Sequence, residues 1–315
     1  MAVIQRKVSF YRLSLEKDVF VRERNAAQVQ ALSNTEMEAQ FNYIYHEKMA
    51  AISNGRKAME VETYNSKYVV EVVSFTDQRA FLRIGQQNSA NTVALRDRNT
   101  LETESVPMRD SQLLELFTFC LIDFETGIVS YIGINGAPRI SAIRNMFYNS
   151  LYKERKIRTI LAAILTDDIL ERLVRKSIIS KISVTVTVPS DEVLSHSMGL
   201  GAASFDALRN VKTRTATYNI TGKRNKNIFD SSGKLAELVA DIQSKFGDDN
   251  IKALSVRAKD FDEKSQQYDL LQYNFTKTVI LGDVDTSTLS VDDFKEALIT
   301  TYETNKDELL RYSRV

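Results

Sequence analysis

Apolar and polar residues alternate along several segments of the chain, which is the pattern of strands buried on one face only. The clearest run is SKISVTVTV at residues 180–188, which Pro189 closes. Short polar turns at Thr76-Asp77 and at Glu125-Thr126-Gly127 separate two further pairs of strands and predict two hairpins. The expected strands are residues 7–15, 67–75, 78–84, 113–123, 128–134, 180–188, 214–220 and 251–260.

Other segments follow the helical period. Thr35-x-x-Glu38 is a candidate capping box, in which the hydroxyl and the carboxylate each satisfy a free backbone N–H. Met37, Phe41 and Met49 then recur at helical spacing, and Gly55 predicts the end of this helix. Further helices are expected at residues 140–152, from Asp167 or Asp168 to about residue 176, near 202–209, at 234–246 and at 290–311.

These elements do not alternate regularly as strand and helix, so the pattern predicts an α+β fold rather than a doubly wound parallel sheet. We expect mixed, mostly antiparallel sheets with packed helices, arranged as two lobes. Pro189 is the expected hinge between them. The predicted division is an N-terminal α+β lobe at residues 1–189 and a C-terminal basic α+β lobe at residues 190–315.

Composition narrows the class of protein. A chain of 315 residues with 43% hydrophobic and 26% charged residues can bury a full core. The longest apolar runs fall short of the ~18–20 residues that span a bilayer, and the first residues lack the apolar core of a secretory signal. A single cysteine, Cys120, allows no internal disulfide and fits a reducing compartment. We therefore expect a cytoplasmic protein.

Charge is balanced overall, with 42 Lys and Arg against 41 Asp and Glu, but it is unevenly distributed. Between Asp206 and Asp230 the chain runs for 23 residues without an acid. Local positive charge is what the phosphates of a nucleic acid contact, whatever the net charge of the protein. The simpler interpretation is a solvated basic turn. The candidate DNA-binding residues in this segment are Arg209, Lys212, Arg214, Lys223, Arg224 and Lys226.

The alternation within this segment also predicts which side chains share a face. Residues 214, 216, 218 and 220 are expected on one face of a strand, with Thr215, Thr217 and Asn219 on the other. The turn that follows would present Lys223, Arg224 and Lys226 together. Two weaker basic clusters are found elsewhere: Arg155, Lys156 and Arg158, and Arg172, Arg175 and Lys176.

Residue types that carry catalysis or hold metals are scarce. The histidines are His46 and His196, so a zinc site of cysteines and histidines is excluded by ligand count. Ser195 and His196 are adjacent and show no nucleophile-elbow pattern, and residues 199–204 lack the third glycine of a dinucleotide-binding turn. We predict no catalytic residues, no metal site and no cofactor.

A metal-dependent nuclease is the alternative function. Asp260, Asp262 and Glu263 cluster after a predicted strand, with Lys264 beside them, and clustered carboxylates of this kind can hold a divalent ion. A solvated turn explains the same residues. Glu154-Arg155-Lys156 matches another acid–lysine spacing, but it lies at the end of a predicted helix.

Several stretches resemble the RexA-like phage-exclusion proteins. The clearest is ALSVRAKD at residues 253–260; residues 218–226 occupy the place of a basic segment, and residues 180–189 and 117–131 resemble two strand regions. The order holds over about residues 65–311. The KwaB component of the Kiwa anti-phage system is a second candidate family with a comparable organisation, since it is a soluble DNA-binding protein beside a membrane protein.

This resemblance implies a homodimeric protein that binds double-stranded DNA without sequence preference and works with a membrane protein encoded by a neighbouring gene. By the same resemblance, Lys223, Arg224 and Lys226 take the DNA-contact role. We therefore expect a non-enzymatic DNA-binding protein of a phage-exclusion, or abortive-infection, system. A module that binds only other proteins is the third interpretation, and it predicts no DNA binding.

Overall fold

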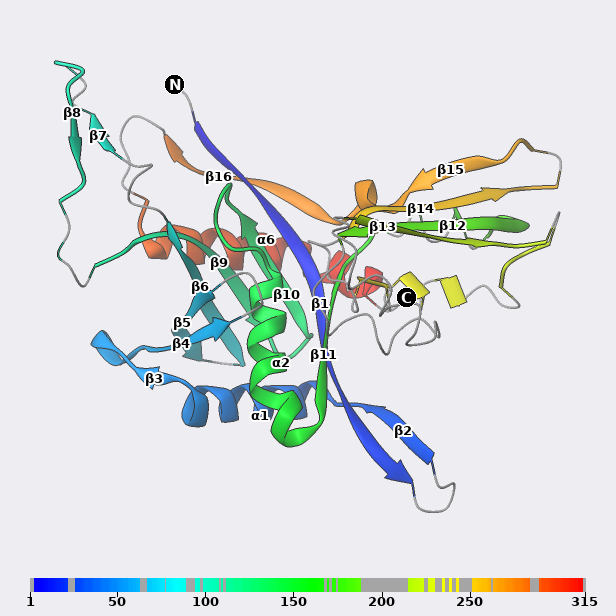
Figure 1. Cartoon of the computed structure of the whole chain (residues 1–315), viewed down its shortest axis with the longest axis horizontal. Helices are drawn as coiled ribbons and strands as arrows, with labels where there is room; N and C mark the ends of the chain where they lie inside the picture. The colour runs from blue at the N-terminus through cyan, green and yellow to red at the C-terminus, as the bar shows by residue number, and fades with distance from the viewer. Residues whose placement is uncertain are drawn as a thin grey trace.

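The architecture is taken from a computed structural model of the chain (Figure 1). Its α-helices and antiparallel strands confirm the predicted α+β class. The structure describes residues 3–21, 26–62, 67–76, 78–88, 94–96, 99–107, 109, 112–166, 169, 172–173, 175–187, 215–223, 226–229, 234–235, 238–239, 242–243, 251–261, 263–283 and 289–313.

The larger sheet has ten strands. Its main order is β11-β1-β10-β9-β6-β5-β4-β3, and β16 and β2 also pair with β1. The strands are β1 (Val3–Val21), β2 (Ala26–Ala31), β3 (Ala50–Ala51), β4 (Lys57–Glu62), β5 (Lys67–Thr76), β6 (Arg79–Asn88), β9 (Leu114–Asp123), β10 (Ile128–Gly133), β11 (Ile157–Ala163) and β16 (Thr276–Asp283).

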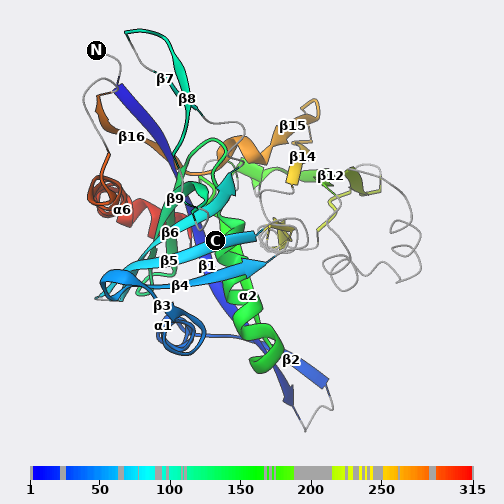
Figure 2. The ribbon, with the colours of Figure 1, turned by 60° about the vertical axis from the view of Figure 1, so that its left-hand side comes forward.

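The long strand β1 organises this sheet because both of its edges are paired. β16 and then β11 follow one edge, and β10 and then β2 follow the other. The register joins Val3 to Asp283, so the start of the chain is paired with a strand near its end. The hairpin of β1 and β2 and the separate hairpin of β7 (Ala94–Arg96) and β8 (Thr103–Ser105) project from the body (Figures 1 and 2).

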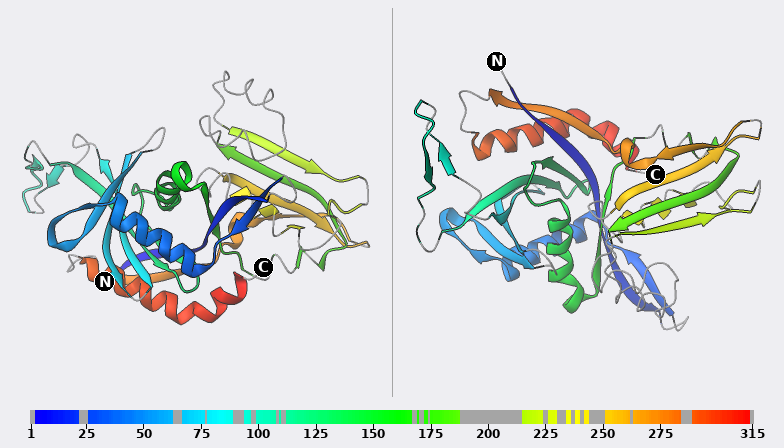
Figure 3. Two further views of the ribbon diagram at one scale, coloured as in Figure 1. Left: turned by 90° about the horizontal axis from the view of Figure 1, so that it is seen from below. Right: turned by 45° about the horizontal axis from the view of Figure 1, so that its top comes forward.

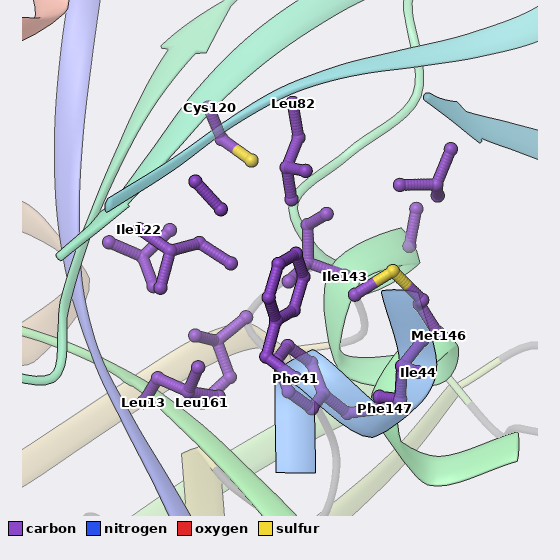
Figure 4. Packing of buried hydrophobic residues seen from close by; sticks show 14 of the residues in the cluster. Leu13, Phe41, Ile44, Leu82, Cys120, Ile122, Ile143, Met146, Phe147 and Leu161 are labelled. Atoms are coloured by element: carbon purple, nitrogen blue, oxygen red, sulfur yellow. The ribbon is translucent and has the colours of Figure 1, made fainter. Parts of the chain in front are cut away.

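Helices cover both faces of the larger sheet (Figure 3, left). On one face, α1 (Asn34–Tyr43) and α2 (Ser141–Arg155) pack against alternate strand residues such as Leu82, as Figure 4 shows. On the opposite face, α6 (Val291–Tyr312) packs against the intervening residues such as Phe81. The alternation of β6 between these two cores explains why residues 80–82 are all buried.

The smaller sheet has four strands in the order β13-β12-β14-β15. It extends away from the larger sheet on one side of the molecule (Figure 1). A third apolar core lies against it, separate from the two cores of the larger sheet. Its strands are β12 (Ile178–Thr187), β13 (Thr215–Thr221), β14 (Ile251–Lys259) and β15 (Gln266–Asp269).

Two chain segments connect the sheets and run side by side. Phe275 N donates to Ile164 O at 2.7 Å, and Thr166 N donates to Tyr273 O at 2.9 Å. The predicted division at residue 189 stays a prediction, and Pro189 lies outside the described residues. The sheets themselves divide the described chain at these connections, because β12 belongs to the smaller sheet while β16 and α6 return to the larger one.

Most predicted elements are present, with shifts at their ends. Both predicted hairpins form, as β5–β6 and β9–β10. The helices expected at residues 140–152 and 290–311 are α2 and α6. The predicted helix near residues 202–209 and the caps at Asp167 or Asp168 lie outside the described residues. Residues 169, 172–173 and 175, and residues 234–235, 238–239 and 242–243, are helical.

The predicted start and end of α1 were wrong. The capping box is formed by Ser33 and Glu36 rather than by Thr35 and Glu38. Leu32, just before the cap, packs against the core that contains Met37, and this contact favours the earlier start. The helix ends as a π turn, η2 (Ile44–Lys48), well before Gly55.

The strands β2, β4, β11 and β16 were not predicted, because their residues do not alternate as clearly, and the short strands β3, β7, β8 and β15 were not predicted either. The remaining short elements are two 3-10 turns. They are η3 (Ser53–Gly55) and η5 (Leu270–Tyr273).

Candidate nucleic-acid interface

The smaller sheet has one apolar face and one polar face. On β12, Ile182, Val184 and Val186 are at most 2% exposed. Apolar residues of the helical segments, such as Leu173 and Val239, pack against this apolar face. The predicted faces of β13 are confirmed for Ala216 and Tyr218, which contact the same core, whereas Ile220 is 38% exposed and Arg214 lies outside the described residues.

The opposite face carries hydroxyl, amide and basic side chains and the carboxylate of Asp269, all exposed or half-buried. We call it the open face. It consists of Lys181, Ser183 and Thr185 of β12, Thr215, Thr217, Asn219 and Thr221 of β13, Ser255 and Arg257 of β14, and Gln267 and Asp269 of β15.

Strand register arranges the open face in rows. In one row Ser183 Oγ donates to Asn219 Oδ1 at 2.8 Å, and in the next Thr185 Oγ1 lies 2.9 Å from Thr217 Oγ1. On the other side of Ser183, Gln267 Nε2 donates to Ser255 Oγ at 3.2 Å. These contacts preorganise a layer of hydroxyl and amide groups that can also bond an outside partner.

The row nearest the outer end of the sheet is basic. Lys181 lies directly opposite Arg257, and Thr221 and Gln267 complete the row. A shallow hollow of about 90 Å³ is lined by Lys181, Ser183, Ser255, Arg257 and Gln267. Like charges directly opposite on neighbouring strands repel each other. Among the described residues neither base is paired with a carboxylate, so an anion bound between them would relieve this repulsion.

The turn after β13 lies at the same end of the sheet. Gly222 N donates to Ser180 O at 3.0 Å, and Ile228 N donates to Ile179 O at 3.0 Å, so the turn is held against the start of β12. Lys223 and Lys226 are both exposed there. Of the predicted DNA-binding residues these two are described, and Arg209, Lys212, Arg214 and Arg224 lie outside the described residues.

We define the outer end as the Lys181–Arg257 row together with the turn after β13 and the turn between β14 and β15, which lie at the far end of the smaller sheet in Figure 1. Bases clearly outnumber acids among its described residues, which concentrates positive field there. The bases of the outer end are Lys181, Lys223, Lys226, Arg257 and Lys264, with Lys176 and Lys259 directly beside it, and the acids are Asp260 and Glu263.

The carboxylates of the nuclease alternative also lie at this end, and a lysine occupies the space between two of them. Lys176 Nζ is 2.6 Å from Asp260 Oδ2 and 2.8 Å from Glu263 Oε2. Ser177 N donates to Asp260 Oδ1 at 3.0 Å. Lys176 and Ser177 together lower the pKa of Asp260, and the two carboxylates raise the pKa of Lys176.

The ammonium group of Lys176 thus pairs with two of the carboxylates that a metal ion would need as ligands. Asp262 lies outside the described residues, and in the part of the chain that the structure describes no three carboxylate, histidine or cysteine side chains are grouped to hold a metal ion. The nuclease alternative stays an untested hypothesis. His196 and residues 199–204 fall in the undescribed part, and His46 is an exposed residue of η2 whose ring contacts Tyr45.

Sequence reasoning missed Lys181 and Arg257. Each is a single base within an alternating strand, so neither belongs to a basic cluster along the chain. The available signal was the repetition of Ser and Thr at every second position of β12 and β13, which predicts a polar sheet face. Only the strand register places the two bases opposite each other.

None of the described helices is both long and apolar enough to cross a membrane. No model of a known protein family matches the sequence, and no curated protein matches it either. The resemblance to the RexA-like proteins therefore depends only on the stretches named above.

Proposed function

We propose that this protein binds double-stranded DNA without sequence preference, through the outer end and the open face of its smaller sheet. The observation that carries the proposal is the basic row of Lys181 and Arg257, neither of which is paired with a carboxylate among the described residues, beside the exposed Lys223 and Lys226. Four basic side chains at one end of a sheet form a compact positive surface, and such a surface binds the phosphates of a nucleic acid.

The type of side chain supports backbone contact rather than base reading. Lysine, serine, threonine and asparagine bond phosphate oxygens in any sequence, whereas base-specific recognition commonly uses a helix or ribbon that enters the major groove. The open face is a broad sheet surface whose helical segments pack on its other side. Contact with the backbone of any duplex follows from this arrangement.

The cellular setting is a proposal that depends on the resemblance to RexA-like proteins alone. In that setting the protein is a homodimer of a phage-exclusion system and acts with a membrane protein encoded by a neighbouring gene. A two-fold dimer would present two outer ends to one duplex, and the second contact would gain from a high effective concentration.

Fluorescence anisotropy of labelled duplexes tests the binding proposal. Random duplexes of equal length should bind alike, and log K should fall with log[salt] with a slope of about −3.6 if four phosphates are contacted per protomer. Plasmid incubated with the protein and Mg²⁺ should be retarded but intact. Absence of binding at low salt, or a strong preference for one sequence over a scrambled competitor, would overturn the proposal. Nicking of the plasmid would favour the nuclease alternative.

A further inference from the structure

One large apolar side chain is strongly exposed within the outer end. Phe261, in the turn between β14 and β15, is 75% exposed, more than any other exposed large apolar residue among those described. A phenylalanine ring buries a large apolar area when it is packed, so leaving it in water forgoes a substantial free energy. An exposed aromatic ring among basic residues is the arrangement used to stack on nucleic-acid bases.

The turn holds this ring outward. Glu263 N donates to Asp260 O at 3.2 Å, which closes a four-residue turn with Phe261 at its second position. Both ends of the turn are fixed to Lys176, through the carboxylates of Asp260 and Glu263. Ser177 adds two further hydrogen bonds to Asp260. The ring is thus presented by a fixed turn rather than by a loose loop.

We propose that Phe261 stacks on an unstacked base of DNA that is held by the outer end. This inference rests on the proposed function. The turn contains two carboxylates, but Lys176 pairs with both Asp260 and Glu263. A nucleobase carries no charge, so these carboxylates would not repel it. The phosphates on either side would lie toward Lys181 and Arg257, where the positive charge is concentrated. The preferred ligand is a duplex with a single-stranded gap, because its bases are already free to stack.

Tryptophan gives a direct test because the chain contains none. A Phe261→Trp variant has one indole, whose emission should be quenched when a base stacks on it. The dissociation constant from this quenching should equal the one from the anisotropy of a labelled gapped duplex. The matched control is Ile280→Trp, since Ile280 is 64% exposed on β16 of the larger sheet. Its emission should not change with DNA.

Affinity and salt dependence give a second, independent measurement. Phe261→Ala should weaken binding to the gapped duplex by about tenfold, the order expected for one stacked ring, and should leave the salt slope unchanged. Binding to a continuous duplex should weaken less. Circular dichroism of the variant should match that of the wild type, which would exclude loss of folding as the cause of weaker binding.

The outcomes separate the two proposals. DNA binding by the wild type, with no quenching in Phe261→Trp and no loss of affinity in Phe261→Ala, overturns the stacking proposal and leaves the proposed function intact. Absence of wild-type DNA binding at low salt overturns both. A blue shift of the Phe261→Trp emission with vesicles of phosphatidylserine and phosphatidylcholine, but no response to DNA, identifies a membrane contact and also overturns stacking.

Discussion

A buried polar network fastens α6 to the hairpin of β9 and β10, and removing it should destabilise the fold by a measurable amount. Asp123 is 1% exposed and accepts hydrogen bonds from Arg79 Nε at 2.8 Å and from the backbone N and the Oγ1 of Thr126, both at 3.0 Å. Thr126 Oγ1 lies 3.0 Å from the hydroxyl of the fully buried Tyr302. Thr126 Oγ1 has one proton, which it donates to Asp123, so the Tyr302 hydroxyl is the donor to Thr126. Burial raises the pKa of Tyr302, so this hydroxyl keeps its proton.

The geometry sets the expected order of two substitutions. Tyr302→Phe removes one neutral hydrogen bond, and Thr126 Oγ1 still accepts from Ile128 N at 3.3 Å, so the cost should be about 1 kcal/mol. Asp123→Ala leaves Thr126 N and the Thr126 hydroxyl without their acceptor. It should cost about 3 kcal/mol, at the low end for a broken buried ion pair, because Arg79 is partly exposed and retains an ion pair with Glu303.

Urea unfolding followed by circular dichroism measures both changes. The matched control is Glu296→Ala, an exposed carboxylate on α6, which should alter the free energy of unfolding by at most about 0.5 kcal/mol. The network would be refuted if Asp123→Ala cost no more than Glu296→Ala. A larger loss from Tyr302→Phe than from Asp123→Ala would also contradict the proposed hydrogen-bond pattern.

Two further predictions concern the helix caps and the oligomeric state. Hydrogen bonds from the backbone N–H of Ser33 and Ser290 lower the pKa of Glu36 and Asp293 below their ordinary values of 4.5 and 3.8. The ionised carboxylates therefore stabilise the folded protein at pH values above these ordinary values. This contribution to stability is lost as the pH falls through the lowered pKa. Ser33→Ala and Ser290→Ala remove the hydroxyl hydrogen bonds to Glu36 and Asp293 but keep the backbone ones. Each should cost about 1 kcal/mol at neutral pH, as measured by urea unfolding, and should flatten the acid loss of stability in part; unchanged acid unfolding would argue against the capping boxes. Light scattering at micromolar concentration should give about twice 35.8 kDa, and a monomer that still binds DNA tightly would remove the dimer from the account.

Local pattern predicted the elements whose burial is uniform along their length. The run at residues 180–188 became β12 because its apolar residues all face one core. Both hairpins were predictable because their turn residues interrupt two apolar runs. The start of α1 was misplaced because two capping boxes overlap in sequence, and a contact of Leu32 with the core selects the earlier one.

Long-range pairing could not be predicted in the same way. Nothing in residues 276–283 indicates that they pair with the first strand, because the choice of partner depends on the whole sheet. The residues of the candidate interface also differ in whether local sequence or long-range pairing brings them together. Lys223 and Lys226 stand out as neighbours in an acid-free segment, whereas Lys181 and Arg257 meet only through the register of β12 and β14.

The most direct test of the central claim compares two variants of equal net charge. One replaces Lys181, Lys223, Lys226 and Arg257 of the outer end by alanine. The other replaces four lysines of the larger sheet and its helices, which are Lys7, Lys67, Lys153 and Lys295. Each set of changes removes four positive charges, which takes the net charge from +1 to −3.

Anisotropy titrations over a range of salt concentrations measure the affinity and the salt slope of both variants. The outer-end variant should lose affinity for every duplex, and its salt slope should fall by up to about 3.6, while the control variant should keep nearly wild-type affinity and slope. Equal losses in both variants would assign binding to net charge alone. Wild-type affinity and slope in the outer-end variant would contradict the claim that DNA binds at this end of the sheet.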